Sequence, residues 1–390
     1  MPGAPLAGLK VLELARVLAG PWIGQTLADL GADVIKVESP DGDDTRRWGP
    51  PFVTLADGTP GDAAYFHCCN RGKRSVIADL RTTQGCELVR ELALRSDVLV
   101  ENFKLGGLDE YGLGYESLHA LNPKLVYCSV TGFGQTGPYA ARPGYDLVIQ
   151  AMSGMMDITG EPDGPPQKIG VALADIMTGI YGVVAIQAAL AQRERTGVGT
   201  RVDMSLLDTM VGILANQAMN YLVSGLAPRR LGNQHPNIVP YQSFETGDGA
   251  VVVAVGNDAQ FARFCAVIGR TDLAQDARYL DNRGRVQHRE QLIPALAAAV
   301  GKFRRQDLLQ ALEQQNVPAG PVNSMADVFA DPQVIARRMR VDLPAPAARD
   351  GTLPSVRTPI VFSDAVLRLD RGAPRLGEHT AEVLRELAGR

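Results

Sequence analysis

The sequence predicts an α/β fold whose large domain is built on an open, mostly parallel sheet. Short apolar runs alternate with segments of helical period through the first 131 residues, and the apolar runs are nearly continuous. Strands that alternate with helices form βαβ units and parallel sheets, and continuous apolar strands suit burial on both faces. The 390 residues are 45% hydrophobic and 21% charged, an ordinary globular composition with room for about two to three domains.

The apolar runs place the first strands, and the periodic segments between them place the helices. Strands are expected at 10–14 (KVLEL), 33–39 (DVIKVES), 74–80 (RSVIADL), 97–103 (DVLVENF) and 124–130 (KLVYCSV). Helices are expected at 21–31, 82–96 and 115–122.

The remaining chain changes character after a Gly- and Pro-rich stretch at 132–170. Helices are expected over 182–197, 200–223, 258–269 and 288–315, and a strand over 249–256 (GAVVVAVG). We therefore divide the chain into a large domain (1–200), a linking helix (201–225), a smaller α+β domain (226–325) and a final segment (326–390). The helical period of the final segment predicts that it returns to pack on the large domain.

Composition excludes several classes of partner. The net charge is −4 with no basic stripe, which argues against nucleic acid. Five cysteines without CxxC spacing predict neither a disulfide framework nor a metal site, and fit a reducing compartment. Glu13 interrupts the apolar N-terminal run, so we expect no signal peptide and a cytoplasmic protein. The uncharged run 209–228 carries three side-chain amides, which predict a buried or linking helix rather than a membrane span.

The segment GFGQTG (132–137) satisfies the G-x-G-x-x-G pattern and follows a predicted strand. A dinucleotide site also needs a helix that opens from this loop, whereas Pro138 and Pro143 follow here. We therefore expect no nicotinamide or flavin. The glycines are expected to allow close backbone approach or tight turns.

Cations lie at or near the ends of several predicted strands or in the loops that follow them. They are Lys36, Lys73, Arg74, Arg81 and Lys104. In an open α/β sheet, ligands bind at the carboxyl ends of the strands, and cations there suit a phosphorylated ligand. The alternative is ordinary solvated charge beside strands. The five histidines are scattered and predict no metal cluster.

The segment GVALADIMTGIYG (170–182) contains a single carboxylate, Asp175, among small and apolar neighbours. Its position before an apolar helical run fits a helix N-cap. The positive end of the helix dipole would favour its charged form.

At this point the sequence resembles the class III coenzyme A transferases. The resemblance covers nearly the whole chain and rests on LKVLELARVLAGPWIGQTLADLGADVIKVESPDGDDTR (9–46), NRGKRSVIADLRT (70–82), DVLVENF, SVTGFGQTGPYAARPGYD (129–146), GVALADIMTGIYG, NVPAGPVNSMADVFADPQV (316–334) and LGEHTAEVL (376–384). It implies a Rossmann-like large domain, a smaller α+β domain and an interlocked homodimer. The implied activity is transfer of CoA from an acyl-CoA thioester to a free carboxylic acid, with CoA as substrate and no metal cofactor.

The resemblance also assigns site residues. Asp175 aligns with the family's nucleophile, which forms acyl anhydride and aspartyl-CoA thioester intermediates. The positions that match CoA contacts are Arg16, Leu18, Ala19, Ala78, Asp79, Leu80, Arg81, Asn102, Phe103, Lys104, Tyr145 and Asp146. Ser39 and Glu110 stand where some members have Arg, so we expect Lys36, Lys104 or Arg71 to contact a phosphate instead.

Two alternatives concern reaction and substrate. The α-methylacyl-CoA racemases resemble this family but have a catalytic His where this chain has Tyr145. A Tyr, with a pKa of about 10, is a poor base at neutral pH, which favours the transferase. The loop 230–244 replaces a poly-Gly loop of oxalate-handling members. Gly232, Asn233, Gln234 and His235 are expected to meet an acyl carboxylate, as in succinate; otherwise the loop is a Pro-ordered connection between domains.

Overall fold

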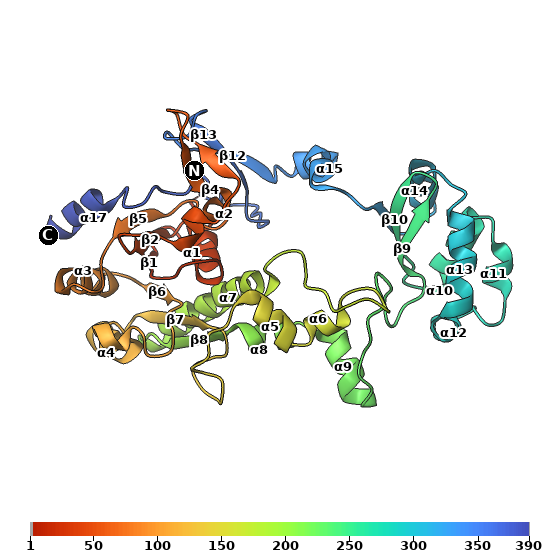
Figure 1. The fold of residues 1–390 in the computed structure, drawn as a ribbon, viewed down its shortest axis with the longest axis horizontal. Helices are drawn as coiled ribbons and strands as arrows, with labels where there is room; N and C mark the ends of the chain where they lie inside the picture. The colour runs from red at the N-terminus through yellow and green to blue at the C-terminus, as the bar shows by residue number, and fades with distance from the viewer. Residues whose placement is uncertain (1–2, 390) are drawn as a thin grey trace. The chain divides into compact units, whose positions relative to one another are not determined.

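The structure is a computed structural model that describes residues 3–389 (Figure 1). Packing contacts group the chain into two units. The first contains the residues up to Met155, Lys168–Ser224 and the residues from Gln333 onward; the second contains Met156–Gln167 and Gly225–Pro332. The predicted domain limits stay predictions.

A six-stranded parallel sheet forms the centre of the first unit, which confirms the predicted fold class. The strand order is β5 (Arg74–Ile77), β2 (Asp33–Glu38), β1 (Lys10–Glu13), β6 (Val98–Glu101), β7 (Val126–Thr131) and β8 (Arg201–Ser205). In the central register, Val11 of β1 lies between Val34 of β2 and Val98 of β6. The five strands predicted from the first third are confirmed.

The predicted helix over 200–223 is wrong. Its first residues form β8, in which Val202 and Met204 pack toward the core at a spacing of two. Ser205 then caps α8 (Leu206–Gly212), because its side chain accepts a hydrogen bond from the Asp208 N–H. A turn at 213–214 then separates α8 from α9 (Ala215–Ser224), and the first residue of α9, Ala215, has a φ of 46°. The alternation at 201–205 is hard to recognise from the sequence, because an apolar helical segment follows it directly.

Helices cover both faces of the sheet. On one face, α1 (Ala19–Asp29) and α7 (Leu173–Thr196) share a core with Val11, Val98 and Val126. On the other, α3 (Thr83–Leu94), α4 (Tyr115–Leu121) and α17 (Thr380–Ala388) share a core with Leu12 and Leu99. Neighbouring strand residues therefore face opposite cores, as continuous apolar strands require.

Two glycines allow α7 to pack tightly against α1. A Cβ on Gly179 would lie 3.0 Å from the Ala19 carbonyl oxygen and 2.9 Å from the Trp22 Cβ. A Cβ on Gly182 would lie 2.5 Å from the Ile23 Cδ1. The GxxG spacing of the sequence therefore sets the distance between these helices.

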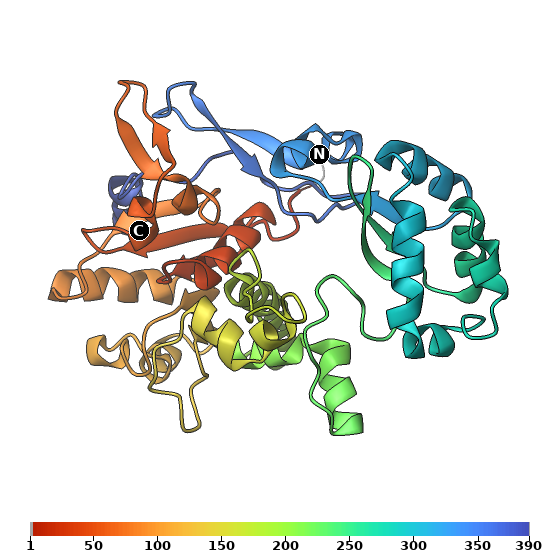
Figure 2. The same cartoon turned by 45° about the vertical axis from the view of Figure 1, so that its right-hand side comes forward.

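The C-terminal helix α17 lies beside strand β5 (Figures 1 and 2). The His379 N–H donates to the Ser75 carbonyl at 2.9 Å, and Arg74 forms ion pairs with Glu382 and Glu386 at 3.1 and 2.8 Å. The edge of the parallel sheet is thereby covered by the end of the chain.

The second unit contains an antiparallel sheet of β11 (Ala319–Pro321), β10 (Gly249–Ala254) and β9 (Tyr241–Thr246). Its helices are α10 (Asp258–Val267), α11 (Thr271–Gln275), α12 (Asn282–Gln287), α13 (Arg289–Val300), α14 (Arg305–Gln314) and α15 (Met325–Ala330). The predicted strand 249–256 and helix 258–269 are confirmed. The predicted helix 288–315 is two helices, because the chain turns at 301–304.

Shorter elements complete the chain. They are η1 (Asp44–Arg47), β3 (Phe52–Thr54), β4 (Pro60–Ala63), α2 (Ala64–His67), η2 (Asp109–Tyr111), α5 (Asp146–Met152), α6 (Met155–Ile158), α16 (Pro332–Ala336), β12 (Arg340–Pro344) and β13 (Thr352–Val356).

Among residues 3–389, one helix, α7, is long and apolar enough to cross a membrane by length and composition. Its face toward α1 belongs to the core, where Ala174, Val183 and Ile186 are buried. The opposite face exposes Ile180, Tyr181 and Val184 to solvent.

Candidate active site

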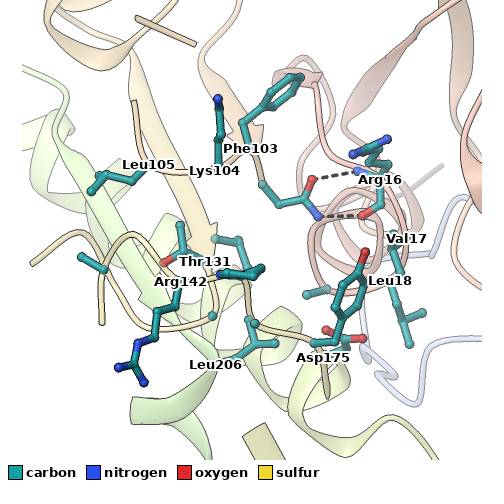
Figure 3. Close-up of a pocket in the computed structure, with 18 of the residues that line it drawn as sticks. Arg16, Val17, Leu18, Phe103, Lys104, Leu105, Thr131, Arg142, Asp175 and Leu206 are labelled. Atoms are coloured by element: carbon teal, nitrogen blue, oxygen red, sulfur yellow. Dashed lines mark hydrogen bonds between the residues drawn. The ribbon is translucent and has the colours of Figure 1, made fainter. Parts of the chain in front are cut away.

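A pocket of about 350 Å³ opens at the carboxyl ends of β1, β6 and β7 (Figure 3). Three segments that follow these strands form its wall, together with Asp175 of α7 and Leu206 of α8. The wall segments are 16–19, 102–105 and 130–132, joined by 140–145. This is the edge at which open parallel sheets bind ligands.

A second cavity, of about 320 Å³, shares Arg16 and Phe103 with the first pocket. Its wall includes the predicted residues Ala78, Asp79, Leu80 and Arg81, together with Tyr111. The two cavities lie in the same unit and adjoin through their shared residues. An elongated ligand can therefore extend from the end of β5 to Asp175.

The structure corrects the N-cap interpretation of Asp175. Helix α7 begins at Leu173 after the N-cap residue Ala172, so Asp175 is the third helical residue. The capping bond comes from Asp146, whose Oδ1 accepts from the Ala174 N–H at 2.8 Å. Asp175 is consequently free of the capping role and lines the pocket.

Burial and the negative charge of Asp146 raise the pKa of Asp175 to about 7. This direction is opposite to the one that the helix dipole predicts, because desolvation and the like charge outweigh the dipole at this position. Near neutral pH the Asp175 carboxyl is therefore divided between its protonated and ionised forms.

Tyr145 and Asp146 lie in different surroundings although they are adjacent. Tyr145 lines the pocket and its side chain is exposed. The Asp146 carboxylate accepts from the Ala174 N–H and from the Gln150 Nε2, each at 2.8 Å. The structure thus gives Asp146 contacts that position α7 and does not place it in the wall of the pocket.

The predicted residues Arg16, Leu18, Ala19, Asn102, Phe103 and Lys104 all line the pocket with Asp175. The Asn102 side chain is occupied by the backbone of Arg16: its Oδ1 accepts from the Arg16 N–H at 3.0 Å, and its Nδ2 donates to the Arg16 carbonyl at 2.7 Å (Figure 3). Asn102 therefore ties the segment after β6 to the segment after β1.

The expectation that Lys36 or Arg71 meets a phosphate is wrong. Lys36 is fully buried and bonds to Glu13, Asp43 and the Ala15 carbonyl. Arg71 is buried against Asp29. Lys73 and Arg74 are likewise buried in ion pairs, so three of the five cations after strands have structural roles.

The other cations that line the two cavities are solvent-accessible, and they include Arg142, whose guanidinium lies 3.9 Å from the Tyr139 ring centroid. Arg16 pairs with Asp44 at 3.2 Å, Arg81 with Asp79 at 2.9 Å and Lys104 with Glu110 at 3.6 Å. Exposed pairs of this kind contribute little free energy, so each cation can exchange its carboxylate for a ligand phosphate.

Glycines shape the loop that follows β7, as the sequence predicted. A Cβ on Gly132 would lie 2.6 Å from the Cα of Gly144, so the two backbones touch at the pocket wall. Gly134 and Gly137 have φ of 82° and 89° and form tight turns. The loop runs on to Tyr145, the N-cap residue of α5.

The four predicted substrate residues, 232–235, belong to the second unit. The Gly232 N–H donates to the Gly160 carbonyl at 2.9 Å, and the Asn233 Nδ2 donates to the Ser243 Oγ at 3.1 Å. The Nδ1 of His235 accepts from the Asn237 N–H at 3.1 Å. Their contact with a substrate stays a prediction.

Several wall residues were missed from the sequence. They are Val17, Leu105, Val130, Thr131, Ala140, Ala141, Arg142, Pro143 and Leu206. The Gly- and Pro-rich composition of 132–143 marked a loop, which is where sites concentrate. Within residues 3–389, no three His, Cys, Asp or Glu side chains are arranged to hold a metal ion.

Comparison with known families matches residues 6–380 to CoA-transferase family III. The chain is 59% identical over 385 residues to a succinate–glutarate CoA-transferase of Agrobacterium fabrum, covering 98% of this chain and 96% of that protein. It is 42% identical over 384 residues to the succinyl-CoA:glutarate CoA-transferase of Homo sapiens, covering 98% and 86%. It is 42% identical over 385 residues to the succinyl-CoA:mesaconate CoA-transferase of Haloarcula hispanica, covering 98% and 96%.

Solved structures give the same match. A CAIB/BAIF family protein from Brucella suis superposes with a TM-score of 0.88 at 59% identity, covering 99% of this chain and 100% of that one. The D175A mutant of Rv3272 from Mycobacterium tuberculosis superposes with a TM-score of 0.86 at 33% identity, covering 98% and 99%.

Proposed function

Because the chain belongs to CoA-transferase family III and is an enzyme of the CoA-transferase type, we propose that it exchanges CoA between two dicarboxylic acids through acyl adducts of Asp175. The observation that supports this most directly is the placement of Asp175. Its carboxylate does not cap α7, and it lies in a pocket that adjoins a second cavity with accessible cations.

The proposed reaction begins when the ionised Asp175 attacks the carbonyl carbon of an acyl-CoA. The thioester bond breaks, which gives an acyl–aspartyl anhydride and CoA thiolate. The thiolate attacks the aspartyl carbonyl, forming an aspartyl-CoA thioester and releasing the donor carboxylate. The acceptor carboxylate then attacks the aspartyl carbonyl of this thioester, which breaks the C–S bond and gives a second anhydride and CoA thiolate. The thiolate attacks the acceptor's acyl carbonyl in this anhydride, which forms the new acyl-CoA and releases the Asp175 carboxylate. Covalent catalysis divides one difficult exchange into easier steps.

The adjoining cavities suggest how CoA would lie. The reactive thioester end would occupy the pocket at Asp175, and the nucleotide end would extend past Arg16 and Phe103 toward Ala78–Arg81. Arg16, Arg81 and Lys104 are the accessible cations for its phosphates. These three cations would take the place of the two arginines that some family members have where this chain has Ser39 and Glu110.

The relatives named above act on succinate, glutarate or mesaconate. We propose succinate as one partner acid and a dicarboxylate of similar length as the other. Gly232, Asn233, Gln234 and His235 remain the proposed contacts for the distal carboxylate. The most informative experiment is a screen of carboxylates of graded length as acceptors from succinyl-CoA and acetyl-CoA, with new thioesters as the readout.

Two further measurements would distinguish the alternatives. Mass spectrometry of the enzyme mixed with succinyl-CoA should reveal a CoA adduct on the peptide that contains Asp175. A racemase would instead exchange the α-proton of a 2-methylacyl-CoA for deuterium without forming that adduct. Deuterium incorporation without CoA transfer would contradict the proposal.

We expect the rate of exchange to depend on the protonation of Asp175. Because the nucleophile is the carboxylate, kcat/KM should rise with pH and level off above an apparent pKa near 7. Asp146→Asn removes the like charge but keeps an oxygen that can accept from Ala174, so it should shift the midpoint to lower pH. Burial remains, so the midpoint should stay above that of an ordinary Asp.

The matched control is Glu116→Gln, which neutralises an exposed carboxylate on α4. Its pH profile should coincide with that of the wild type. Identical midpoints for wild type and Asp146→Asn would show that Asp146 does not act on Asp175 electrostatically.

We propose that the enzyme is a homodimer, as the resemblance implies. Three helices of the first unit, α5, α7 and α9, expose apolar side chains that a second copy would cover: Leu147, Val148, Met152, Ile180, Tyr181, Val184, Met219, Tyr221, Leu222 and Val223. Light scattering should give about twice the chain mass of 41.7 kDa. A monomer at micromolar concentration would refute this part of the proposal.

A further inference from the structure

Val17 has an unusual backbone conformation in the wall of the pocket. Its φ is 72°, in the left-handed region. A β-branched residue there is a genuine outlier, and such outliers persist only when the surrounding structure holds them in place. Val17 lies in the five-residue segment 14–18, which joins β1 to α1, and it lines the same pocket as Asp175.

The segment 14–18 is tied down along its length. The Leu14 N–H donates to the Val100 carbonyl at 2.8 Å, and Asn102 brackets the Arg16 backbone. The Ala15 carbonyl accepts from the Lys36 Nζ at 2.7 Å. The Val17 carbonyl accepts from the Cys69 Sγ at 3.5 Å.

The Val17 N–H itself donates to the carboxylate of Asp43, at 3.3 Å from each oxygen. Asp43 is buried and pairs with the fully buried Lys36 at 3.0 Å. Thr45 donates to Asp43 Oδ1 through both its N–H, at 3.0 Å, and its Oγ1, at 2.8 Å. The carboxylate is therefore fixed by Lys36 and Thr45, neither of which lines the pocket that holds Asp175, and it also accepts from the strained turn at Val17.

We propose that Asp43 is a positioning residue, which holds Val17 in the left-handed conformation and thereby sets the wall that faces Asp175. Asp43 is absent from the wall of the pocket that holds Asp175 and belongs to the wall of the second cavity, so its effect on the reacting end would pass through the Val17 backbone. The proposal rests on the proposed reaction at Asp175. Relaxation of Val17 would displace the segment 16–19, which also leads into the first turn of α1.

A double-mutant cycle tests this role. Asp43→Asn should lower kcat about 100-fold, because small misplacements of a reacting site cost about that factor. Gly adopts positive φ without strain, so Val17→Gly should not need Asp43 to hold the turn, and the kcat of this single variant is the reference for the cycle. In the Asp43→Asn background, Val17→Gly should recover at least about tenfold of the lost rate. A double mutant no faster than Asp43→Asn would overturn the proposal.

A milder variant covers the case in which Asp43→Asn fails to fold. Thr45→Val removes one hydrogen bond that orients the Asp43 carboxylate, and kcat should fall about fivefold, again with rescue by Val17→Gly. An unchanged kcat, or a loss that Val17→Gly does not rescue, would refute the proposal.

The control is Asp29→Asn, which breaks the buried pair with Arg71 away from the segment 14–18. It should lower the melting temperature but leave kcat within about twofold, and Val17→Gly should have no rescuing effect. Adduct formation on Asp175 separates the two proposals. If wild type forms the adduct but the cycle shows no rescue, only the role of Asp43 is refuted; if no adduct forms, the proposed function fails.

Discussion

Asp175→Asn is expected to abolish CoA exchange and, at the same time, to stabilise the fold above neutral pH. The loss should be about 10⁴-fold or more in kcat, because an amide cannot form the acyl adducts. Since burial raises the pKa of Asp175 to about 7, ionising it in the folded protein costs free energy as pH rises from about 4 to 7. The neutral amide does not carry this cost, so its free energy of unfolding at pH 8 should exceed that of the wild type by about 1–3 kcal/mol.

The measurement is thermal or urea unfolding of both proteins at pH 4 and pH 8, beside a CoA-exchange assay. The difference in stability should be small at pH 4, close to the unfolded pKa of Asp, where little of the cost of ionisation has been incurred. Glu194→Gln, an exposed carboxylate near the other end of α7, serves as the control and should leave activity and stability unchanged. Normal turnover by Asp175→Asn would refute the assignment of the nucleophile.

Gly179→Ala is expected to damage both stability and catalysis, although Ala favours helices more than Gly does. The added Cβ would lie 3.0 Å from the Ala19 carbonyl oxygen, a backbone atom that cannot move alone. Overpacking of this kind costs about 1–3 kcal/mol, beyond the gain in helix propensity. Asp175 lies one turn before Gly179, so separation of α7 from α1 should also lower kcat about 10- to 100-fold.

A graded series of glycine variants checks this expectation. Gly182→Ala should cost less than Gly179→Ala, because its Cβ meets the flexible end of Ile23. Gly212→Ala, at the end of α8, meets nothing within 4 Å and should be neutral or slightly stabilising. Equal melting temperatures for Gly179→Ala and Gly212→Ala would show that the contact between α1 and α7 is not limiting.

Local patterns in the sequence predict the parallel sheet and its helices well, because strands buried on both faces produce continuous apolar runs. They predict β8 poorly. The alternation at Val202 and Met204 adjoins an apolar helix, and only pairing with β7 reveals that these residues form a strand. The break at Ala215 has no side-chain signal at all.

Patterns in the sequence likewise predict only some of the residues that line the site. The strand-end pattern gave Lys104 and the resemblance gave Arg16 and Asn102, and all three line the pocket because the ends of parallel strands meet at one edge. The strand-end pattern also gave Lys36 as a phosphate contact, but this side chain is buried and pairs with Glu13 and Asp43. Which cations are buried depends on pairings between residues distant in sequence, and a single sequence does not show these pairings.

The attachment of α17 to β5 has a consequence for how the chain folds during synthesis. Ser75 and His379 are neighbours in space, yet about 300 residues separate them along the chain. The first unit therefore has its sheet edge closed only when nearly the whole polypeptide has left the ribosome, and contacts of such long range form slowly. The sheet and most helices of the second unit come from one continuous stretch within 225–332. We therefore expect a translational intermediate in which this stretch is already structured while the edge strand β5 is still open, and in which chaperones are most needed to prevent aggregation.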